Sequence, residues 1–299
     1  MRILITGGAG FLGARLAEEL ILIKQKVALL VRKEDNLWRL KGLEKNIQIY
    51  FSGKETGKVF KKFKPETVIH LATDFGRQNY DPIKMLETNI LFSTKLLELC
   101  VEYNCRKFIN SSTCLPSEYN LYAASKNAFL EIAGYYANNK NIKFIDVVLG
   151  YMYGEKDDKS KFIPHVIDSI FKGKNIKATG GGQSRDFVYV GDVSRKIAEL
   201  TQRDPSAEKF MRCRISSGKY LTIKEIISSI EKISGIKAKV KWGALAYKSN
   251  EVFDVKNFEK IPVIPECKKA DTLLGSGLKK TLDWYSFEQS KPGKPRGRR

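Results

Sequence analysis

The chain of 299 residues has few cysteines, and none of them fall in a paired or metal-binding pattern. Their number is odd, they are scattered, and no Cys-x-x-Cys spacing occurs. They are Cys100, Cys105, Cys114, Cys213 and Cys267. A disulfide framework or a zinc site needs cysteines at conserved short spacings or in even sets. The sequence therefore predicts no disulfide framework and no metal site, and a reducing, cytoplasmic setting fits best.

The sequence also lacks a long apolar run, because its longest apolar stretches have only the length of a strand. The N-terminus leads directly into the strand-like stretch Arg2–Thr6, without the pattern of a signal peptide. Internal repeats are absent as well. We therefore expect a globular α/β protein that is not inserted into a membrane, with room for one large domain and a smaller lobe.

Acidic residues are scarce, since 33 Asp and Glu stand against 53 Lys and Arg and give a net charge of +20. Two interpretations remain open: a solvated basic surface, which we favour, or attraction to a polyanion such as a nucleotide, an anionic membrane surface or nucleic acid. No basic stripe interleaved with aromatic residues occurs, so nucleic acid is not the expected partner. Residues 286–299 end in SKPGKPRGRR, which predicts a disordered basic tail.

Short apolar runs of strand type alternate with amphipathic helical stretches through the first half of the chain. The expected strands are 3–6, 27–31, 47–51, 67–71, 107–111 and 142–149, and the expected helices are 11–24, 81–103 and 122–138. Such alternation predicts a Rossmann fold, a doubly wound parallel sheet with helices on both faces.

The pattern loosens from about Gly154 onward. We expect a nucleotide-binding domain over 1–160, rejoined by about 185–205, and a smaller C-terminal α/β substrate lobe over 161–285. Within the second half, 187–190 has the pattern of a strand and Asp192 is expected to cap a helix. Thr222 and Glu225 have the spacing of a capping box at the start of a helix.

The first strand runs into a turn that contains Gly7, Gly10 and Gly13, and a helical stretch follows. Glycine allows the tight turn and the close approach of a pyrophosphate, while the helix start offers free N–H groups and a positive dipole end. The alternative is a structural turn without any phosphate. Because the turn follows an N-terminal strand, we favour a bound dinucleotide.

The end of the second strand indicates which dinucleotide to expect. An acidic residue there would bind the ribose 2′-hydroxyl of NAD, whereas this chain carries Arg32 and Lys33. Two cations suit the 2′-phosphate of NADP, because a guanidinium can donate two parallel hydrogen bonds to phosphate oxygens. We therefore expect NADP, with NAD as the alternative in which both residues are ordinary surface cations. Asp35 lies too far along the chain to be the expected ribose ligand.

A catalytic pattern follows the strand 107–111, where hydroxyl residues are followed by Tyr122 and Lys126. Residues four apart share one face of a helix. An ammonium beside a phenol favours the ionised phenol, so Tyr122 could exchange a proton near neutral pH. A Ser or Thr hydroxyl could hold the substrate oxygen while a nicotinamide transfers hydride.

Five motifs support a family resemblance: Thr6–Gly13, Val68–Thr73, Glu87–Asn89, Gly180–Val193 and Ile215–Lys219. In these motifs the chain resembles the extended short-chain dehydrogenases/reductases that act on nucleotide sugars, the NAD-dependent epimerase/dehydratase family. The similarity runs from residue 1 to about 240. The resemblance implies an enzyme with a Rossmann domain, a nucleotide-sugar substrate and a homodimer that pairs through the helices 86–102 and 122–136.

The resemblance also implies roles for individual residues. Tyr122 would be the acid/base, and Lys126 would be its partner and a ligand of the nicotinamide ribose. Thr113 would hold the substrate oxygen, with Ser112 in reserve, and Arg185 would bind the substrate's diphosphate. Implied cofactor contacts are Gly7, Gly10, Phe11, Leu12, Gly13, Arg32, Lys33, Leu71, Ala72, Thr73, Asn89, Tyr122 and Lys126. His70, in contrast, is expected to be a satisfied strand residue, not a catalyst.

Departures from the family pattern reduce the number of reactions that this chain is expected to catalyse. The family's dehydratases carry Asp-Glu directly after the hydroxyl residue, whereas this chain has Cys114 and Leu115. The loop between Thr113 and Tyr122 is also shorter than in the 4-epimerases. This arrangement looks most like the CDP- or dTDP-4-keto-6-deoxyhexose reductases of the abequose and paratose synthase type.

We therefore expect NADPH-dependent reduction of the C4 keto group of a nucleotide-linked 4-keto-6-deoxyhexose, as in deoxysugar and O-antigen biosynthesis. The first alternative is a nucleotide-sugar 4-epimerase that keeps NAD tightly bound. A second alternative, suggested by the basic surface, is a non-catalytic nucleotide-sensing or RNA-binding member of the fold.

Overall fold

The structure, a computed structural model, describes residues 1–76, 80–203, 208–247, 251–253, 256–267 and 271–290. The chain forms two compact units. The first comprises residues 1–149, 193–215 and 257–268, and the second comprises 150–192, 216–256 and 269–299. The first break thus falls eleven residues earlier than the expected boundary at 160. The chain returns to the first unit twice, over 193–215 and 257–268, whereas a single return over about 185–205 was expected.

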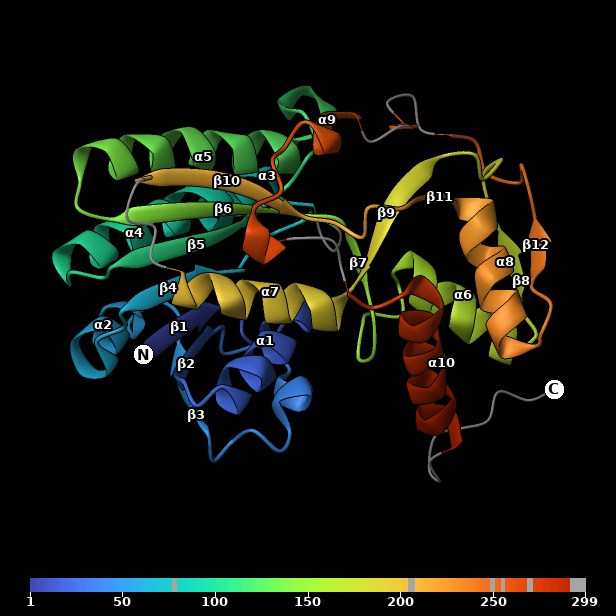
Figure 1. The fold of residues 1–299 in the computed structure, drawn as a ribbon, viewed down its shortest axis with the longest axis horizontal. Coiled ribbons are helices and arrows are strands. Elements are labelled where there is room, and N and C mark those ends of the chain that lie inside the picture. The colour runs from blue at the N-terminus through green and yellow to red at the C-terminus, as the bar shows by residue number, and fades with distance from the viewer. Residues whose placement is uncertain (77–79, 204–207, 248–250, 254–255, 268–270, 291–299) are drawn as a thin grey trace. The chain divides into compact units, whose positions relative to one another are not determined.

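A seven-stranded sheet forms the centre of the first unit (Figure 1). Its strand order is β10-β6-β5-β4-β1-β2-β3, and every neighbouring pair is parallel. The strands are β1 (Arg2–Thr6), β2 (Lys26–Val31), β3 (Ile47–Phe51), β4 (Thr67–His70), β5 (Lys107–Ser112), β6 (Lys143–Leu149) and β10 (Phe210–Ile215). The strand order changes direction at β1 and β4, which confirms the predicted doubly wound Rossmann sheet.

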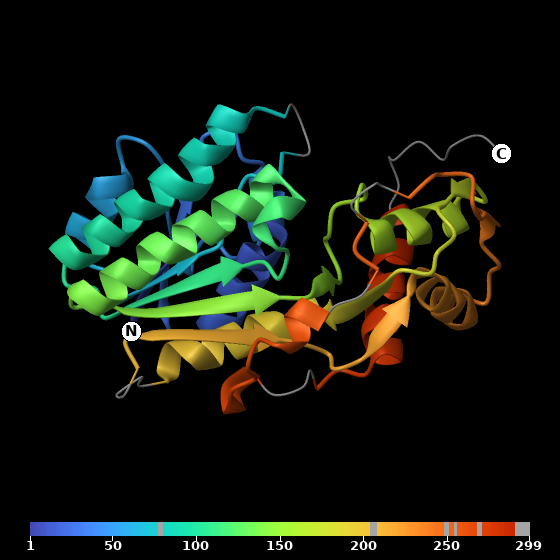
Figure 2. The ribbon, with the colours of Figure 1, turned by 90° about the horizontal axis from the view of Figure 1, so that it is seen from above.

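Helices cover both faces of this sheet, as Figure 2 shows from above. One face carries α2 (Thr56–Phe63), α4 (Ser93–Glu102) and α5 (Leu121–Asn139), whose apolar side chains form one core cluster with β1, β2, β4, β5 and β6. The other face carries α1 (Phe11–Leu22) and α7 (Val190–Gln202). Under α5, Phe144 of β6 stacks on both Phe108 and Phe210, each with 5.5 Å between ring centroids.

The helix expected over 81–103 forms, with a change of helix type in the middle. Asp81 caps it by accepting from the backbone N–H groups of Ile83 and Lys84. The chain then passes through α3 (Pro82–Leu86), a π-helical segment (Glu87–Phe92) and α4. A π-helical turn inserts an extra residue and is frequent at functional sites. This segment turns Asn89 fully inward, which helical periodicity alone did not predict.

The second unit has two small sheets and three longer helices. Its strands are β7 (Tyr151–Tyr153), β8 (Asn175–Lys177), β9 (Ser184–Tyr189), β11 (Tyr220–Thr222) and β12 (Lys239–Lys241), and its helices are α6 (Phe162–Phe171), α8 (Ile223–Ser234) and α10 (Leu274–Ser290). A short helix, α9 (Lys256–Glu259), lies where the chain returns to the first unit. The predicted capping box at Thr222 and Glu225 is confirmed.

The strand expected over 187–190 is confirmed as β9, although it begins earlier, at Ser184, and ends at Tyr189. Two other local expectations for the second half were wrong. Asp192 lies inside the first turn of α7, and its carboxylate accepts from the backbone N–H and the hydroxyl of Thr272 instead of capping the helix. Residues 286–290 belong to α10, so they are not part of a disordered tail. The remainder, 291–299, lies outside the described residues.

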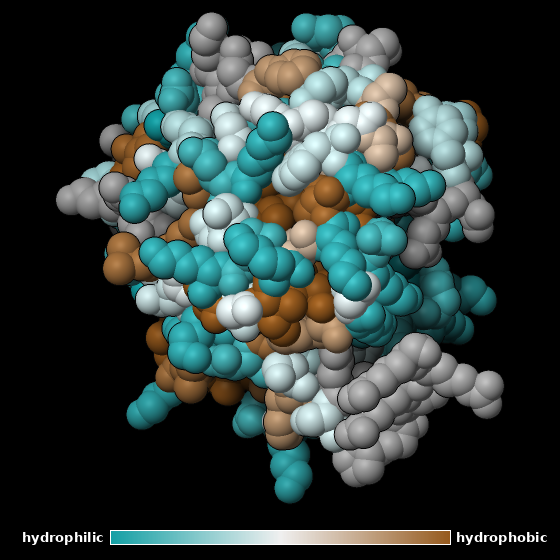
Figure 3. Space-filling model, turned by 90° about the vertical axis from the view of Figure 1, so that its right-hand side faces the viewer, coloured by the Kyte–Doolittle hydropathy of each residue, from teal (hydrophilic) through white to brown (hydrophobic). Residues whose placement is uncertain are grey.

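Within the part of the chain that the structure describes, no helix is long and apolar enough to cross a membrane. Figure 3 shows the face on the side of α8 and β12, where long hydrophilic side chains surround smaller hydrophobic areas. This distribution agrees with a solvated surface there.

Candidate active site

The glycine turn after β1 leaves no room for side chains. Gly7 has a φ of +69°, and a Cβ at this position would lie 2.8 Å from the backbone nitrogen of Ala72. A Cβ on Gly13 would overlap the carbonyl oxygen of Gly7. The turn is closed by a hydrogen bond from the Gly10 N–H to the Gly7 carbonyl, 2.9 Å long. Glycine is therefore required here both for conformation and for close backbone packing.

The start of α1 offers backbone donors and no capping side chain. Its N-cap residue is Gly10, which has no side chain to accept from the N–H groups of the first turn, where Phe11, Leu12 and Gly13 lie. The helix also has no acidic residue in its first turn. A helix start with these properties suits an anion such as a pyrophosphate, so the predicted cradle and the dinucleotide fit each other.

The end of β2 carries both a cation and an acid. Arg32 donates from its backbone N–H and its guanidinium to the Asp35 carboxylate, at 2.9 and 2.8 Å. The Arg32 side chain remains 60% exposed, and Lys33 is exposed beside it. Asp35 was not the expected ribose ligand because of its distance along the chain, but the chain folds back here and places its carboxylate against Arg32.

The segment after β4 is fastened to β1 and to the π-helical segment. The backbone N–H of Leu71 donates to the Thr6 carbonyl, and that of Ala72 donates to the Thr6 hydroxyl, both at 3.2 Å. The Thr73 hydroxyl donates to the Asn89 side-chain oxygen at 3.1 Å. The Asn89 amide in turn donates to Ser125 of α5. Asn89 thus connects the segment after β4 with the helix that carries Tyr122 and Lys126.

His70 is a satisfied strand residue, as the sequence predicted. It is fully buried, and its two ring nitrogens lie 2.7 Å from the hydroxyls of Thr6 and Ser93. Burial lowers the pKa of His70 well below its usual value, with a smaller contribution from the charge of Lys126. The ring is therefore neutral at physiological pH.

Tyr122 and Lys126 lie one turn apart at the start of α5. The side chain of Asn120 caps this helix by accepting from the Ala123 N–H at 2.8 Å. The Tyr122 ring packs against Phe75, with 5.0 Å between centroids, and remains half-buried. Because residues four apart share a helix face, the phenol and the amine lie on the same side of α5.

The Lys126 side chain is buried without a hydrogen-bond partner. It is 1% exposed, and no acceptor for its Nζ lies among the described residues. Burial lowers the pKa of Lys126 to about 8, and the charge of Asp146 opposes this effect. A buried amine without an acceptor is costly, so it fits a ligand that brings its own acceptors, such as ribose hydroxyls.

Thr113 and Ser112 follow at the end of β5, and both are largely buried. The Thr113 hydroxyl accepts from the Leu115 N–H at 3.2 Å, and its carbonyl accepts from Arg212 of β10 at 3.4 Å. A groove of about 430 Å³ opens along residues 113–117, with Arg212 and Lys260 in its lining.

Among the described residues, no cluster of His, Cys, Asp and Glu could hold a metal ion.

Beneath α5 lies a polar row that the sequence analysis missed, formed by Asn110, Asp146 and Arg212. These residues are register partners on the adjacent strands β5, β6 and β10, so their side chains share one face of the sheet. Asp146 accepts from Asn110 at 2.8 Å and from Arg212 at 3.1 Å. The available signal was a single acidic residue inside an otherwise apolar strand, Phe144–Val148.

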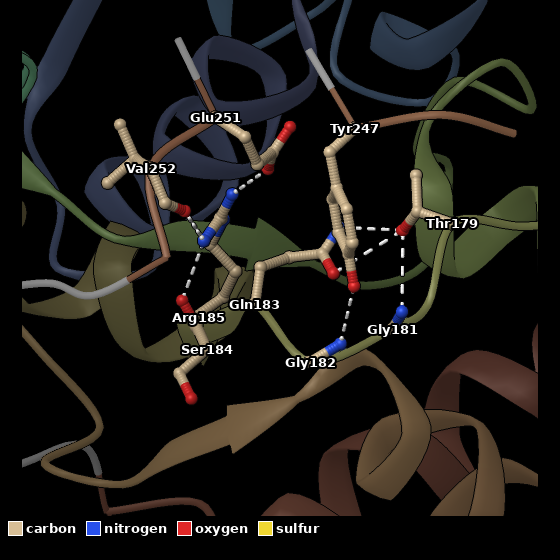
Figure 4. A network of polar contacts seen from close by, with 9 residues as sticks. All are labelled: Thr179, Gly181, Gly182, Gln183, Ser184, Arg185, Tyr247, Glu251 and Val252. Carbon is tan, nitrogen blue, oxygen red and sulfur yellow. Dashed lines mark hydrogen bonds and ion pairs between the residues drawn. The ribbon is translucent and has the colours of Figure 1, made fainter. Parts of the chain in front are cut away.

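Arg185, the predicted diphosphate ligand, lies on β9 in the second unit (Figure 4). Its guanidinium donates to the Glu251 carboxylate at 2.8 Å and to the carbonyls of Ser184 and Val252. It also lies 5.2 Å above the ring of Tyr151. The structure therefore shows Arg185 bound to groups of its own unit.

Nearby in the second unit, a glycine loop is held by polar contacts (Figure 4). The Gly182 N–H donates to the Tyr247 hydroxyl at 3.2 Å, and the Gly181 N–H donates to Thr179 at 3.4 Å. The amide of Gln183 donates to the same threonine hydroxyl. The first part of the motif Gly180–Val193, residues 180–183, thus forms a loop held in place directly before β9.

Comparison with known proteins agrees with this geometry. The model of the NAD dependent epimerase/dehydratase family matches residues 3–211. A CDP-abequose synthase of Salmonella typhimurium is 29% identical over 64% of this chain and 67% of its own length. A CDP-abequose synthase of Salmonella muenchen is 27% identical over 85% of this chain and 87% of its own length.

Among solved structures, a UDP-glucose 4-epimerase of Thermotoga maritima with UDP-glucose has a TM-score of 0.80. It is 22% identical and covers 97% of this chain and 100% of its own, so it supports the fold alone. The family match spans the glycine turn, the strand ends and the Tyr122–Lys126 helix in one continuous stretch. The chain therefore belongs to the NAD-dependent epimerase/dehydratase family, as the motifs predicted, and is an NAD(P)-dependent enzyme of the extended short-chain dehydrogenase/reductase type.

Proposed function

We propose that this enzyme reduces the C4 keto group of a nucleotide-linked 4-keto-6-deoxyhexose with NADPH. The observation that carries the proposal is the Tyr122–Lys126 pair on one face of α5, with the Lys126 amine buried and without a partner among the described residues. Cys114 and Leu115 stand where a dehydratase would need two carboxylates. The similarity to two CDP-abequose synthases supports a sugar nucleotide as substrate.

The residues of the first unit would hold the cofactor. The glycine turn and the start of α1 would bind its diphosphate, and Lys126 would bind the ribose next to the nicotinamide. When bound, the nicotinamide supplies hydride to the carbonyl carbon of the substrate. Leu71, Ala72 and Thr73 would line its groove, with Asn89 holding that segment in place.

The choice of NADP rests on Arg32 and Lys33 at the end of β2. Both side chains are exposed, so a 2′-phosphate could reach them. Asp35 favours the opposite choice, because its carboxylate lies against Arg32 and would repel that phosphate. The measured ratio of the dissociation constants for NADP and NAD tests this step, and replacing Arg32 by Ala should move the ratio toward NAD.

The chain's own residues would handle the proton. Tyr122 would donate a proton to the carbonyl oxygen of the substrate as the negative charge on that oxygen develops. A protonated Lys126 would stabilise the phenolate that remains. The hydroxyl of Thr113, with Ser112 in reserve, would hold the substrate oxygen within reach of the phenol. Bulk solvent then restores the proton on Tyr122 before the next turnover.

The nucleotide diphosphate of the substrate would bind Arg185. A planar guanidinium suits phosphate oxygens because it can donate two parallel hydrogen bonds. Since Glu251 already accepts from this guanidinium, a bound diphosphate would compete with the carboxylate for it.

Incubation with NADPH and a panel of CDP-, dTDP-, GDP- and UDP-4-keto-6-deoxyglucose tests the proposed function. Oxidation of NADPH, followed by absorbance, should be rapid with one member of the panel and depend on the keto group. No oxidation with any member would remove the reductase assignment.

A 4-epimerase is the second candidate, and the position of Asp35 favours it because an acid at the end of β2 suits NAD. An epimerase uses the same Tyr122–Lys126 pair but retains its cofactor through each turnover. Protein that purifies with one equivalent of NAD and acts without added reductant would favour this candidate. Protein that purifies without cofactor and needs NADPH would favour the reductase.

We also infer a homodimer that pairs through the helical stretches 86–102 and 122–136. These stretches carry exposed large apolar residues, Leu91 of the π-helical segment at 64% and Tyr135 of α5 at 60% exposure. Apolar side chains on adjacent helices would be covered if two copies packed together. Analytical ultracentrifugation should give a dimer that Leu91→Glu converts to monomers.

A further inference from the structure

Phe75 lies beside the ring of Tyr122 with much of its own surface open to solvent. The two ring centroids are 5.0 Å apart, and the ring planes are tilted by 34°. Phe75 is 49% exposed, whereas Tyr122 is half-buried. A single exposed apolar residue is ordinary on a protein surface. This one differs from the others because it packs against the residue proposed to donate the proton.

The backbone just before Phe75 is held by a buried side chain. The Asp74 N–H donates to the side-chain oxygen of Asn89 at 2.8 Å, and the Asn89 amide donates to the Asp74 carbonyl at 3.0 Å. Asn89 is completely buried and also donates to Ser125 of α5 at 3.0 Å. One side chain therefore fastens the backbone at Asp74 to the helix that carries Tyr122.

A tight turn holds the backbone just after Phe75. Gly76 has a φ of +64°, and its N–H donates to the Asp74 carboxylate at 2.7 Å. A Cβ at Gly76 would lie 2.6 Å from the terminal methyl group of Met85 and 2.9 Å from the ring of Tyr80. Met85 of α3 is itself only 1% exposed, so the turn packs closely against a buried side chain. Phe75 is thus presented by a segment that is anchored on both sides.

The place of the Phe75 ring indicates which part of a sugar it would meet. An acid lies within about 2.6–3.2 Å of the oxygen that it protonates. With the C4 oxygen at the Tyr122 hydroxyl, the carbons bonded to C4 would lie close to the neighbouring ring. C3 carries a hydroxyl group, which a phenyl ring cannot pair, whereas C5 carries C6, which is a methyl group in a 6-deoxyhexose. The apolar ring therefore suits the C6 methyl group.

The acid next to Phe75 has the same preference. The Asp74 carboxylate belongs to the same turn, where it accepts from Gly76. A sugar with a carboxylate at C6 would bring a second negative charge near it and would lose water against the phenyl ring. A hydroxymethyl group would lose the water bound to its hydroxyl. Phe75 and Asp74 together thus favour a methyl group over either alternative.

We propose that Phe75 is a specificity-determining residue, whose exposed face contacts the C6 methyl group of the sugar and selects a 6-deoxyhexose. The inference rests on the proposed function and deepens it, because it takes the role of Tyr122 from there and names the residue that recognises the missing hydroxyl. A complete apolar pocket rejects an added hydroxyl by up to about a hundredfold, so a single apolar wall should give about tenfold.

Binding of paired sugar nucleotides tests this inference without turnover. Each pair consists of the nucleoside diphosphate derivatives of glucose and of 6-deoxyglucose, on CDP, dTDP, GDP and UDP. Neither sugar has a keto group, so neither reacts when NADPH is bound. Calorimetric titration of the full chain with NADPH present gives the two dissociation constants. In the wild type, the 6-deoxy sugar of the tightest-binding pair should bind about tenfold more tightly.

Four variants separate recognition from general damage. Phe75→Ala removes the wall, so the ratio of the two dissociation constants should fall to about one. Phe75→Asn should lose the preference too, and it is readable even if Phe75→Ala does not fold. Phe75→Leu keeps an apolar side chain and should retain a preference of at least about threefold. Phe287→Ala is the matched control, because Phe287 is 62% exposed on α10, and its ratio should equal that of the wild type.

The outcomes distinguish the two proposals. A wild-type preference that disappears in Phe75→Ala or Phe75→Asn and persists in Phe75→Leu and Phe287→Ala supports the role of Phe75. A wild-type ratio near one, or an unchanged ratio in Phe75→Ala and Phe75→Asn, overturns it, while oxidation of NADPH by a keto sugar of the panel would leave the proposed function intact. A wild-type protein that binds no member of any pair overturns the proposed function and this inference with it.

Discussion

The guanidinium of Arg185 and the carboxylate of Glu251 form a largely buried ion pair, with 2.8 Å between nitrogen and oxygen and side-chain exposures of 9% and 12%. A buried charge that loses its partner is strongly unfavourable. If Arg185 binds the diphosphate as proposed, the ligand would compete with Glu251 for the guanidinium. The ion pair would then add an energetic cost to substrate binding.

Replacing Glu251 by Gln should tighten the binding of a nucleoside diphosphate, because the guanidinium no longer has to leave an ionised partner. We expect the dissociation constant of CDP or UDP to fall by about three- to tenfold. Calorimetric titration measures it, and the gain should disappear when Arg185→Ala is added. Weaker binding in Glu251→Gln would instead show that the carboxylate itself contacts the ligand.

Tyr122→Phe should lose most of the turnover, because the phenolic proton donor is removed. A positioned acid contributes about a hundred- to ten-thousandfold to the rate. Cofactor affinity should change little, since the ring keeps its packing against Phe75. Steady-state kinetics and a cofactor titration measure the two effects, and turnover that survives would place the proton donor elsewhere.

Gly13→Ala should abolish cofactor binding, because the added methyl group would overlap the carbonyl of Gly7 in the turn. Gly57→Ala is the matched control, since a Cβ on that helical glycine meets no atom within 4 Å. The control should bind cofactor normally and be about 0.5–1 kcal/mol more stable. Equal cofactor affinity in the two variants would contradict the tight turn.

Lys107→Met should destabilise the first unit. The Lys107 amine is buried and donates to the carbonyls of Leu200, Thr201 and Arg203 at the end of α7. Methionine fills similar space but leaves buried carbonyls unpaired, at a cost of about 2 kcal/mol in the free energy of unfolding. Denaturant unfolding measures the loss, and Lys237→Met, at an 89% exposed side chain, should show none.

The stability of the protein should rise with pH on the alkaline side because of Lys126. Its folded pKa is about 8 and its unfolded value is about 10.5, so between these values the unfolded chain binds more protons. The free energy of unfolding therefore increases as pH rises from 8 toward 10.5. Comparing urea unfolding of the wild type and Lys126→Met at pH 7, 8 and 9 tests this, and parallel curves would contradict it.

The sequence predicted the sheet and the tight glycine turn of the first unit because both depend on local patterns. The alternation of apolar runs and helical stretches predicts the succession of β1 to β6 along the chain. The glycines Gly7, Gly10 and Gly13 are required because the backbone turns so tightly there. The i, i+4 spacing of Tyr122 and Lys126 predicted that both lie on one face of a helix. The same local reasoning predicted the capping box at Thr222.

Only the tertiary structure determined which charged side chains come into contact. Asn110, Asp146 and Arg212 are up to 102 positions apart in the sequence, and only strand register makes them neighbours. The Glu251 partner of Arg185 and the burial of Lys126 likewise follow from contacts between distant segments. The sequence by itself determined the fold and the identity of the reactive groups. Packing determined the charge states of these groups, because electrostatic energy depends on the separation of charges in space and on their exposure to solvent.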